Sequence, residues 1–162
     1  ESDYPSEFNT IFEERNVPSK PTVYLCAQDR GPNGSLNGSE RLLMLVNAPA
    51  DGDRQSWSED DVARTRDNAL AVLERCGLNL SFRDSDCVST TPNDWHGRFP
   101  GSGGSLYGGA SHGIWSSFTR PGARSRLKGL YLSGGSVHPG PGVPMATLSG
   151  RLAASAVVRD IA

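Results

Sequence analysis

Residues 129–154 read GLYLSGGSVHPGPGVPMATLSGRLAA, which places a short apolar strand, a loop of glycines and prolines and a helix in succession. We expect the strand over 128–133 and the helix over 144–161, with Pro144 at its first position. Such a unit directs backbone N–H groups and the positive end of a helix dipole at one point, where anionic groups bind. An ordinary αβ connection is the alternative, but it needs one or two glycines, whereas this loop holds four together with three prolines.

The segment before this strand is also rich in glycine. Residues 97–144 hold 13 of the 19 glycines and 5 of the 11 prolines. Long irregular segments in compact domains are usually functional or disordered. Tyr107, Trp115 and Phe118 argue against disorder, because disordered segments contain few aromatic residues.

The first half of the chain predicts a different arrangement. β-branched and apolar alternation indicates strands near 22–27, 41–47 and 79–84. Ser58 is a candidate N-cap for a helix to Cys76, and Thr91-Pro92 is expected to start a short helix. The predicted fold class is therefore α+β, with a mixed or antiparallel sheet covered by helix 58–76. Strand 128–133 and helix 144–161 are expected to form a separate αβ unit.

Composition excludes several classes of protein. Hydrophobic residues make up 36% and charged residues 21% of the 162 residues, which is typical of a soluble globular domain. No apolar run is long enough to cross a bilayer, and the N-terminal residues do not resemble a signal peptide. The three cysteines form no C-x-x-C pair, so we expect reduced thiols in a cytoplasmic protein.

Charge is divided unevenly along the chain. Residues 1–94 hold 17 acidic and 9 basic side chains, whereas residues 95–159 hold 7 basic and no acidic ones. This division favours an anionic partner, with a plain cationic surface as the alternative. No nucleic-acid-binding module is recognisable, so a diphosphate-bearing cofactor or an anionic membrane surface fits better than nucleic acid.

Other catalytic patterns are incomplete. Residues 109–113 match G-x-S-x-G, but no strand leads into them and no acidic residue lies between Ser111 and His138, so a hydrolase triad is not expected. The histidines are widely spaced and lack a nearby carboxylate, so no metal site is expected. Neither a Walker A loop nor a complete G-x-G-x-x-G is present, and a complete dinucleotide-binding enzyme needs such a turn.

Three segments carry a resemblance to a known family. Residues 129–154, the upstream FPGSGGSLYGGASHGIWSSFTRPGARSRLKG and the early PTVYLCAQDRG together resemble bacterial phytoene-desaturase-type carotenoid desaturases. The resemblance covers essentially the whole chain, and its branch is the one that desaturates hydroxy- or methoxyneurosporene-type carotenoids at the 3,4 position in photosynthetic bacteria. Members are FAD-dependent oxidoreductases about three times this length. The resemblance therefore implies a C-terminal fragment of such an enzyme, which alone is expected to be inactive and to bind FAD poorly.

The resemblance also implies domains and roles. Residues 1–127 would belong to the carotenoid domain, and residues 128–162 would supply the final strand and helix of the FAD-binding domain. Two sets of site residues follow: for FAD, Gly134, Gly135, His138, Gly140, Gly142, Val143, Pro144 and Met145; for the carotenoid, Leu106, Tyr107, Trp115 and Phe118. The flavin would accept the electrons, because side chains cannot. The sequence identifies no catalytic acid or base.

Partners and location follow in the same way. We expect the parent enzyme to bind its carotenoid substrate while peripheral to the inner or photosynthetic membrane on the cytoplasmic side. The C-terminal unit has lost the sheet that it would close, so its exposed apolar surface is expected to favour a homo-oligomer. A small non-catalytic module that grips an anionic ligand at loop 134–145 is the alternative function.

Overall fold

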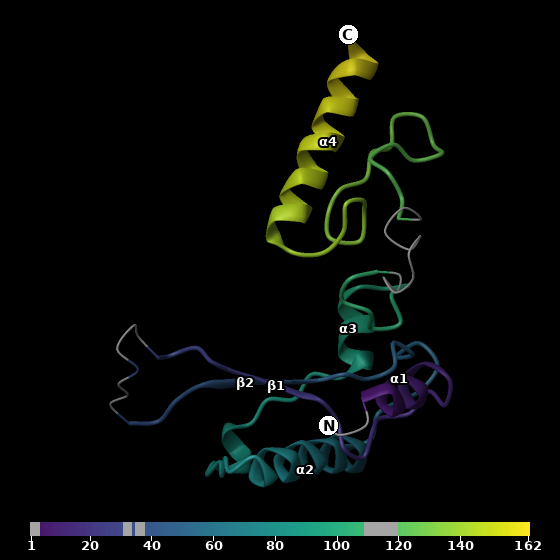
Figure 1. Ribbon diagram of the computed structural model, residues 1–162. Coiled ribbons are helices and arrows are strands. Elements are labelled where there is room, and N and C mark those ends of the chain that lie inside the picture. Colours follow the sequence, from purple (N-terminus) through teal and green to yellow (C-terminus); the bar gives the residue numbers. More distant parts are fainter. Residues whose placement is uncertain (1–3, 31–33, 35–37, 109–119) are drawn as a thin grey trace. The chain divides into compact units, whose positions relative to one another are not determined.

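The computed structural model describes residues 4–30, 34, 38–108 and 120–162 (Figure 1). The chain divides into two compact units, Glu1–Gly104 and Ser105–Ala162. The α+β class is confirmed: the described residues form a two-stranded antiparallel sheet and four α-helices. The boundary between the two units lies within the glycine-rich segment 97–144, whereas the division between a carotenoid domain and an FAD domain is expected at 127/128.

The first unit is built on a β-hairpin. Strand β1 (Val23–Ala27) pairs antiparallel with β2 (Leu42–Val46), from Val23 opposite Val46 to Ala27 opposite Leu42. The arms continue past the strands through charged pairs, because Arg41 donates to Asp29 and Arg30 donates to Glu40. These ion pairs are exposed and contribute little stability, so the paired β-branched and apolar residues define the register.

Helix α2 (Glu59–Arg75) lies against β1, as expected for the helix that covers the sheet. Ser58 and Asp61 form a reciprocal capping box at its N-terminus. A cap of this kind typically stabilises a helix by about 1 kcal/mol. Ala69 and Leu73, four residues apart and so on one face of the helix, are buried.

Helix α3 (Pro92–Arg98) begins where Thr91-Pro92 predicted it, with a second capping box between Thr91 and Asp94. Asn93 fastens this helix to the loop after β2. Its side-chain amide donates to the carbonyls of Gly52 and Gln55, and its Oδ1 accepts from the backbone N–H of Trp57. The loop comes so close that a Cβ on Gly52 would lie 2.3 Å from the Pro92 carbonyl oxygen.

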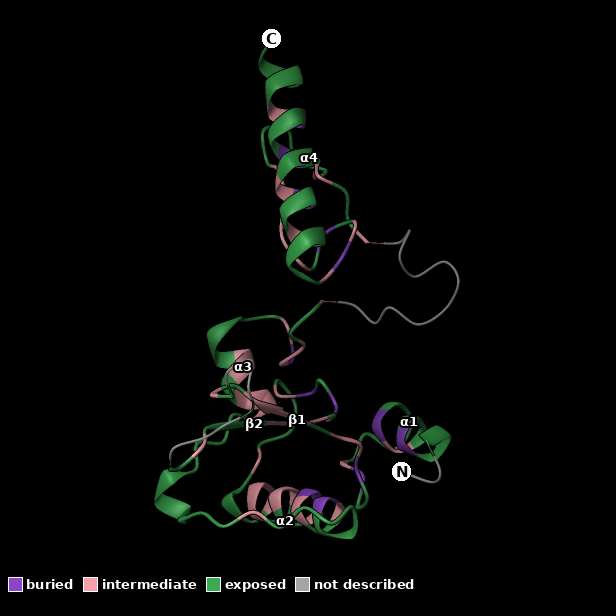
Figure 2. Ribbon diagram, turned by 60° about the vertical axis from the view of Figure 1, so that its left-hand side comes forward, coloured by how far each residue is buried: buried purple, intermediate pink, exposed green. Residues whose placement is uncertain are grey.

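Helix α1 (Tyr4–Phe12) was not anticipated. It buries Ile11 and the carboxylate of Glu7, which is only 3% exposed (Figure 2). Its aromatic residues recur at a spacing of four, Tyr4, Phe8 and Phe12, and this period signals a helical face. Sequence reasoning missed this signal because the helix is short and begins at Tyr4, close to the first residue of the sequence.

The third strand, expected at 79–84, is absent from the described residues. Residues 78–83 have no regular secondary structure, and a 3₁₀ turn covers Asp84–Asp86. The alternation there is genuine, but a strand exists only where a neighbour supplies a hydrogen-bonding ladder. Phe82 consequently remains 43% exposed.

The strand expected at 128–133 is reduced to a single bridge. Tyr131 pairs antiparallel with Arg124, and the N–H of Leu132 donates to the Ala123 carbonyl at 2.8 Å. The segment thus turns back on its own upstream neighbour. Helix α4 (Val143–Ile161) follows, one residue earlier than predicted, so that Pro144 is its second residue and not its first.

Two general findings complete the description of these residues. Helices in the described ranges are too short or too polar to span a bilayer. All three cysteines lie in those ranges, and each carries a free thiol.

Candidate functional site

The glycine loop between Tyr131 and α4 is anchored to the middle of the helix. The N–H of Gly134 donates to the hydroxyl of Ser149 at 3.1 Å, and Ser149 is completely buried. Val137, also buried, donates its N–H back to the Gly134 carbonyl at 3.2 Å and closes a turn. The N–H of His138 donates to the Pro121 carbonyl at 2.9 Å, and the His138–Pro139 peptide bond is cis. The first half of the loop is therefore held at Gly134 and at His138.

Glycine is required in this loop because of the backbone conformation more than because a side chain would collide with neighbouring atoms. Gly134, Gly140 and Gly142 have φ values of 121°, 135° and 99°, which L-residues with a side chain rarely adopt. A Cβ on Gly142 or Gly134 would meet nothing within 4 Å. Within the chain itself, the positive φ is therefore the reason for glycine at position 142.

The N-terminus of α4 offers free backbone donors. Gly142 is its N-cap and Val143 its first residue, while Pro144 has no N–H. Val143 and Met145 belong to the first turn, whose N–H groups lack an intrahelical acceptor. The N–H of Ala146, in contrast, donates to the Gly142 carbonyl at 2.8 Å and is not a free donor. The first turn carries no acidic side chain, which suits an anionic or electronegative ligand.

Arg120 joins the glycine loop to the turn at 105–108. Its Nη1 donates to the carbonyls of Tyr107 (2.9 Å) and Gly135 (3.1 Å). Next to Tyr107, Gly108 approaches the loop so closely that an added Cβ would lie 2.9 Å from the Cβ of Ser136. One residue from each of the two predicted sets, Tyr107 and Gly135, is therefore held to the same guanidinium through its backbone carbonyl. Sequence reasoning singled out neither Arg120 nor Ser149, although both lie in segments that resemble the desaturases, because the residues they contact are distant in the sequence.

The side chains predicted to line a substrate channel are only partly described. Leu106 and Tyr107 are 46% and 59% exposed, so their apolar surfaces are available for contact. Trp115 and Phe118 lie outside the described residues. Val143 and Met145, at the start of α4, are also exposed.

The far end of α4 is fastened by a charged cluster. Asp160 accepts from Arg124 Nε at 3.0 Å and Nη2 at 2.8 Å, and from the Tyr131 hydroxyl at 2.7 Å. These bonds, that from Arg124 first, lower the pKa of Asp160 to about 2. The same carboxylate raises the pKa of Tyr131. The cluster orients α4, whose other end carries the free N–H groups.

Titratable groups suited to metal binding are not gathered in the described ranges, where no group of three or more His, Cys, Asp or Glu residues could hold an ion. His96 Nδ1 accepts a hydrogen bond from the N–H of Gly103 in the first unit, at 3.3 Å. His112 lies outside the described residues.

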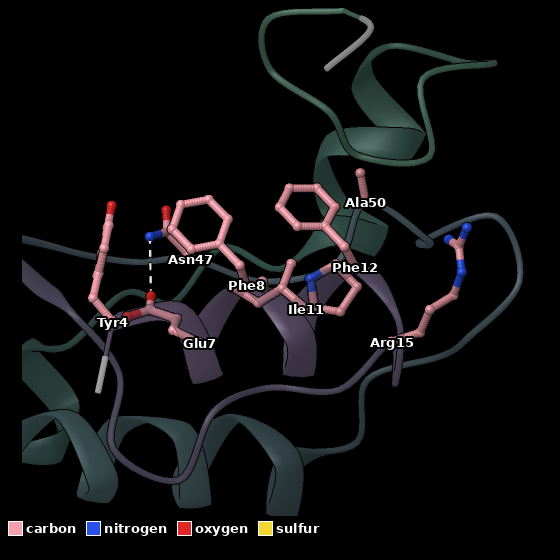
Figure 3. Close-up of a pocket in the computed structure, with 10 residues that line it drawn as sticks. Tyr4, Glu7, Phe8, Ile11, Phe12, Arg15, Asn47 and Ala50 are labelled. Carbon is pink, nitrogen blue, oxygen red and sulfur yellow. Dashed lines mark hydrogen bonds between the residues drawn. The ribbon is translucent and has the colours of Figure 1, made fainter. Parts of the chain in front are cut away.

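A second candidate site lies within the first unit. Helix α1 and residues 47–50 enclose a pocket of about 430 Å³ (Figure 3). Most of its wall is apolar, and the Tyr4, Phe8 and Phe12 rings follow one another along it: Tyr4 and Phe8 lie 5.0 Å apart edge to face, Phe8 and Phe12 5.9 Å apart and stacked. No sequence prediction fell on this pocket.

The comparisons with known proteins agree with one another. Residues 3–158 match the family described as flavin containing amine oxidoreductase. The chain is 50% identical over 99% of its length to a hydroxyneurosporene desaturase from Rubrivivax gelatinosus, and 42% identical over 89% to one from Rhodobacter capsulatus. It is 32% identical over 95% to a 1-hydroxycarotenoid 3,4-desaturase from a Flavobacterium species.

Coverage of these relatives is partial. The chain spans 31%, 28% and 32% of their respective lengths, so it corresponds to about a third of each. The family match nevertheless extends over nearly all of the chain. The chain therefore belongs to the flavin containing amine oxidoreductase family.

Proposed function

We propose that this chain forms part of an FAD-dependent desaturase that introduces C=C bonds into hydroxy- or methoxyneurosporene-type carotenoids at the 3,4 position. The observation that carries the proposal is the 50% identity, over 99% of the chain, to a hydroxyneurosporene desaturase. Bound FAD supplies the electron acceptor for removal of hydrogens from adjacent carbons, which side chains cannot provide. The residues of this chain contribute binding and orientation.

The glycine loop and the start of α4 fit the cofactor. Two free N–H groups, at Val143 and Met145, are available without a competing carboxylate in the first turn. In the proposed enzyme they donate to electronegative atoms of the flavin ring. A dipole at such a helix end stabilises a nearby negative charge by roughly 0.3–2 kcal/mol. Gly134, Gly135, His138, Gly140 and Gly142 complete the proposed cradle, and Pro144 fixes the direction in which the helix begins.

The turn at 105–108 is proposed to carry substrate contacts. Arg120 ties the Tyr107 carbonyl to Gly135, so the exposed Leu106 and Tyr107 side chains leave from a backbone fixed beside the cradle. Trp115 and Phe118 are proposed to extend the same apolar lining. In this arrangement residues 1–127 serve the carotenoid and residues 128–162 close the FAD-binding domain.

We further propose that the complete enzyme works at the cytoplasmic face of the inner or photosynthetic membrane. The absence of acidic residues from 95–159 supports this, because a cationic segment is attracted to anionic lipid. The apolar residues exposed along α4 support close packing on another element or self-association into a homo-oligomer.

A chimera tests the activity directly. The segment of the Rubrivivax gelatinosus desaturase that aligns with this chain is replaced by it, and desaturation of a hydroxylated neurosporene-type carotenoid is followed by absorbance of the lengthened polyene. We expect a flavin-containing, active enzyme. A chimera that folds and binds FAD but leaves the carotenoid unchanged would contradict the proposed function.

Two glycine variants of that chimera test the cradle. Gly142→Val is expected to reduce flavin content or to lower the flavin reduction potential. Gly129→Val is the matched control, since Gly129 also has positive φ (82°) and open space around it, but lies outside the loop. Equal flavin content and equal potential in the two variants would show that the flavin does not lie at this loop.

A further inference from the structure

The pocket beside α1 has the chemistry of a site for a long apolar molecule with one polar end. Its wall is mainly apolar, and its volume of about 430 Å³ lies within the range of small-molecule sites. Phe8 and Phe12 are 43% and 45% exposed, although both are large and apolar. Three consecutive rings form a strip on which a flat conjugated chain can lie, because aromatic faces and edges contact such a chain over a large area.

Uncharged polar groups occupy one end of this strip, and a charged side chain lies at the other. Tyr4 and Asn47 lie together there, and Arg15 lies at the opposite end (Figure 3). Asn47 Nδ2 donates to Glu7 Oε1 at 3.1 Å. The amide is thereby held in one orientation, with its Oδ1 directed away from the Glu7 carboxylate (Figure 3). That oxygen can accept a hydrogen bond from a hydroxyl group.

Both carboxylate oxygens of Glu7 accept hydrogen bonds from other residues of the chain. Its Oε2 accepts from the N–H of Thr22 at 3.0 Å and from the Thr22 hydroxyl, and its Oε1 accepts from Asn47. Its charge is therefore compensated by fixed donors and does not call for a cation. Arg15, at the far end of the pocket, is exposed, and most of the remaining wall is apolar, so a highly charged ligand lying along the strip would lose most of its hydration without replacement.

We infer that this pocket binds the hydroxyl-bearing end of an acyclic carotenoid, with the polyene along Tyr4, Phe8 and Phe12 and the hydroxyl at Asn47. The inference rests on the proposed function and deepens it, because it assigns recognition of the hydroxyl to residues of the first unit. Relatives named for hydroxyneurosporene and 1-hydroxycarotenoid substrates support this class of ligand. A site built to bond a hydroxyl discriminates against the analogue that lacks it.

Binding to the chain itself is the first test, because it needs no activity. A 1-hydroxylated acyclic carotenoid in detergent micelles is added, and the induced circular dichroism of its visible polyene band is measured. We expect Phe8→Ala to weaken binding roughly tenfold. Phe82→Ala is the matched control, since Phe82 is equally exposed (43%) and lies outside the pocket. Equal binding by both variants would overturn the inference.

Discrimination is the second test. Asn47→Leu removes the acceptor, and Tyr4→Phe removes a hydroxyl group from the same end with less risk to folding. In the chimera, the ratio of kcat/KM for the hydroxylated carotenoid to that for its counterpart without a hydroxyl is expected to fall about tenfold in Asn47→Leu. Tyr4→Phe is expected to lower the ratio less.

The outcomes separate the inference from the proposed function. An inactive chimera combined with Phe8-dependent binding to the chain would refute the desaturase and leave the pocket supported. An active chimera whose substrate ratio is the same in all variants would refute the pocket. If Phe8→Ala lowers thermal stability much more than Phe82→Ala while binding and the ratio are unchanged, the strip packs against protein and the inference fails.

Discussion

Replacing Ser149 by alanine tests how the glycine loop is held. The Ser149 hydroxyl accepts the Gly134 N–H at 3.1 Å and is completely buried, whereas Gly134 is half-buried. In Ser149→Ala the N–H of Gly134 loses its acceptor. Water can replace that acceptor only in part, because the methyl group of alanine then faces the N–H from inside the unit.

The size of the effect follows from that geometry. A neutral hydrogen bond contributes about 0.5–1.5 kcal/mol net, and a buried donor left unsatisfied costs about 1–3 kcal/mol. Alanine recovers up to about 0.5 kcal/mol through its better helix propensity. Ser155→Ala, on the exposed side of α4, shares that gain without the loss. We therefore expect Ser149→Ala to be less stable than Ser155→Ala by about 1 kcal/mol.

Two measurements check this expectation. Thermal unfolding should separate the variants by roughly 2–4 °C for a chain of this length. Hydrogen exchange should show a loss of protection at the Gly134 amide of about fivefold, since a difference of 1 kcal/mol corresponds to that factor. If Ser149→Ala matches Ser155→Ala in both, the loop is held by something other than this bond, and the reasoning is refuted.

Three further outcomes are expected. Gly52→Ala should destabilise the chain by roughly 1–3 kcal/mol, because the new Cβ would lie 2.3 Å from a backbone oxygen, whereas Gly97→Ala, with open space in a helix, should be neutral or stabilising in urea unfolding. The contribution of Asp160 to stability should be present above pH 4 and lost as pH falls towards its lowered pKa of about 2, because protonation breaks its bonds to Arg124. In Asp160→Asn the unfolding midpoint should therefore depend less on pH between 4 and 2 than it does in the unchanged chain. Asn93→Ala should lower the unfolding free energy by about 2–3 kcal/mol, since it removes three hydrogen bonds between α3 and the loop after β2, and an unchanged midpoint would contradict their role.

The elements that sequence reasoning found are those with local signals. Ser58 and Thr91 each precede an acidic residue by three positions, and a capping box needs nothing further along the chain. Helix α4 follows from Gly142 and Pro144 in the same way. The expected strands at 79–84 and 128–133 depend on partners, and no local pattern shows whether a partner exists.

The candidate site likewise contains features with a local sequence signal and features that depend on residues far apart in the chain. The glycine loop could be predicted from composition, because the residues that adopt positive φ values there are themselves glycines. The contacts of Arg120 and Ser149 could not, since each side chain bonds to a residue 15 positions away and no local pattern shows which residue that is. The α1 pocket was missed although its spacing of aromatic residues was visible, because the wall opposite comes from residues 47–50 after β2.

The bonds that hold the second unit are nested, and this has a consequence for the order of folding. Gly134 and Ser149 are 15 residues apart, and Tyr131 and Asp160, 29 apart, enclose them; Arg124 and Asp160, 36 apart, enclose both. Once the inner loop has closed, the outer ones span a shorter free chain and lose less entropy on closure. The unit should therefore close from the inside outward, so that loss of the Ser149 hydroxyl slows folding while loss of the Asp160 carboxylate mainly speeds unfolding.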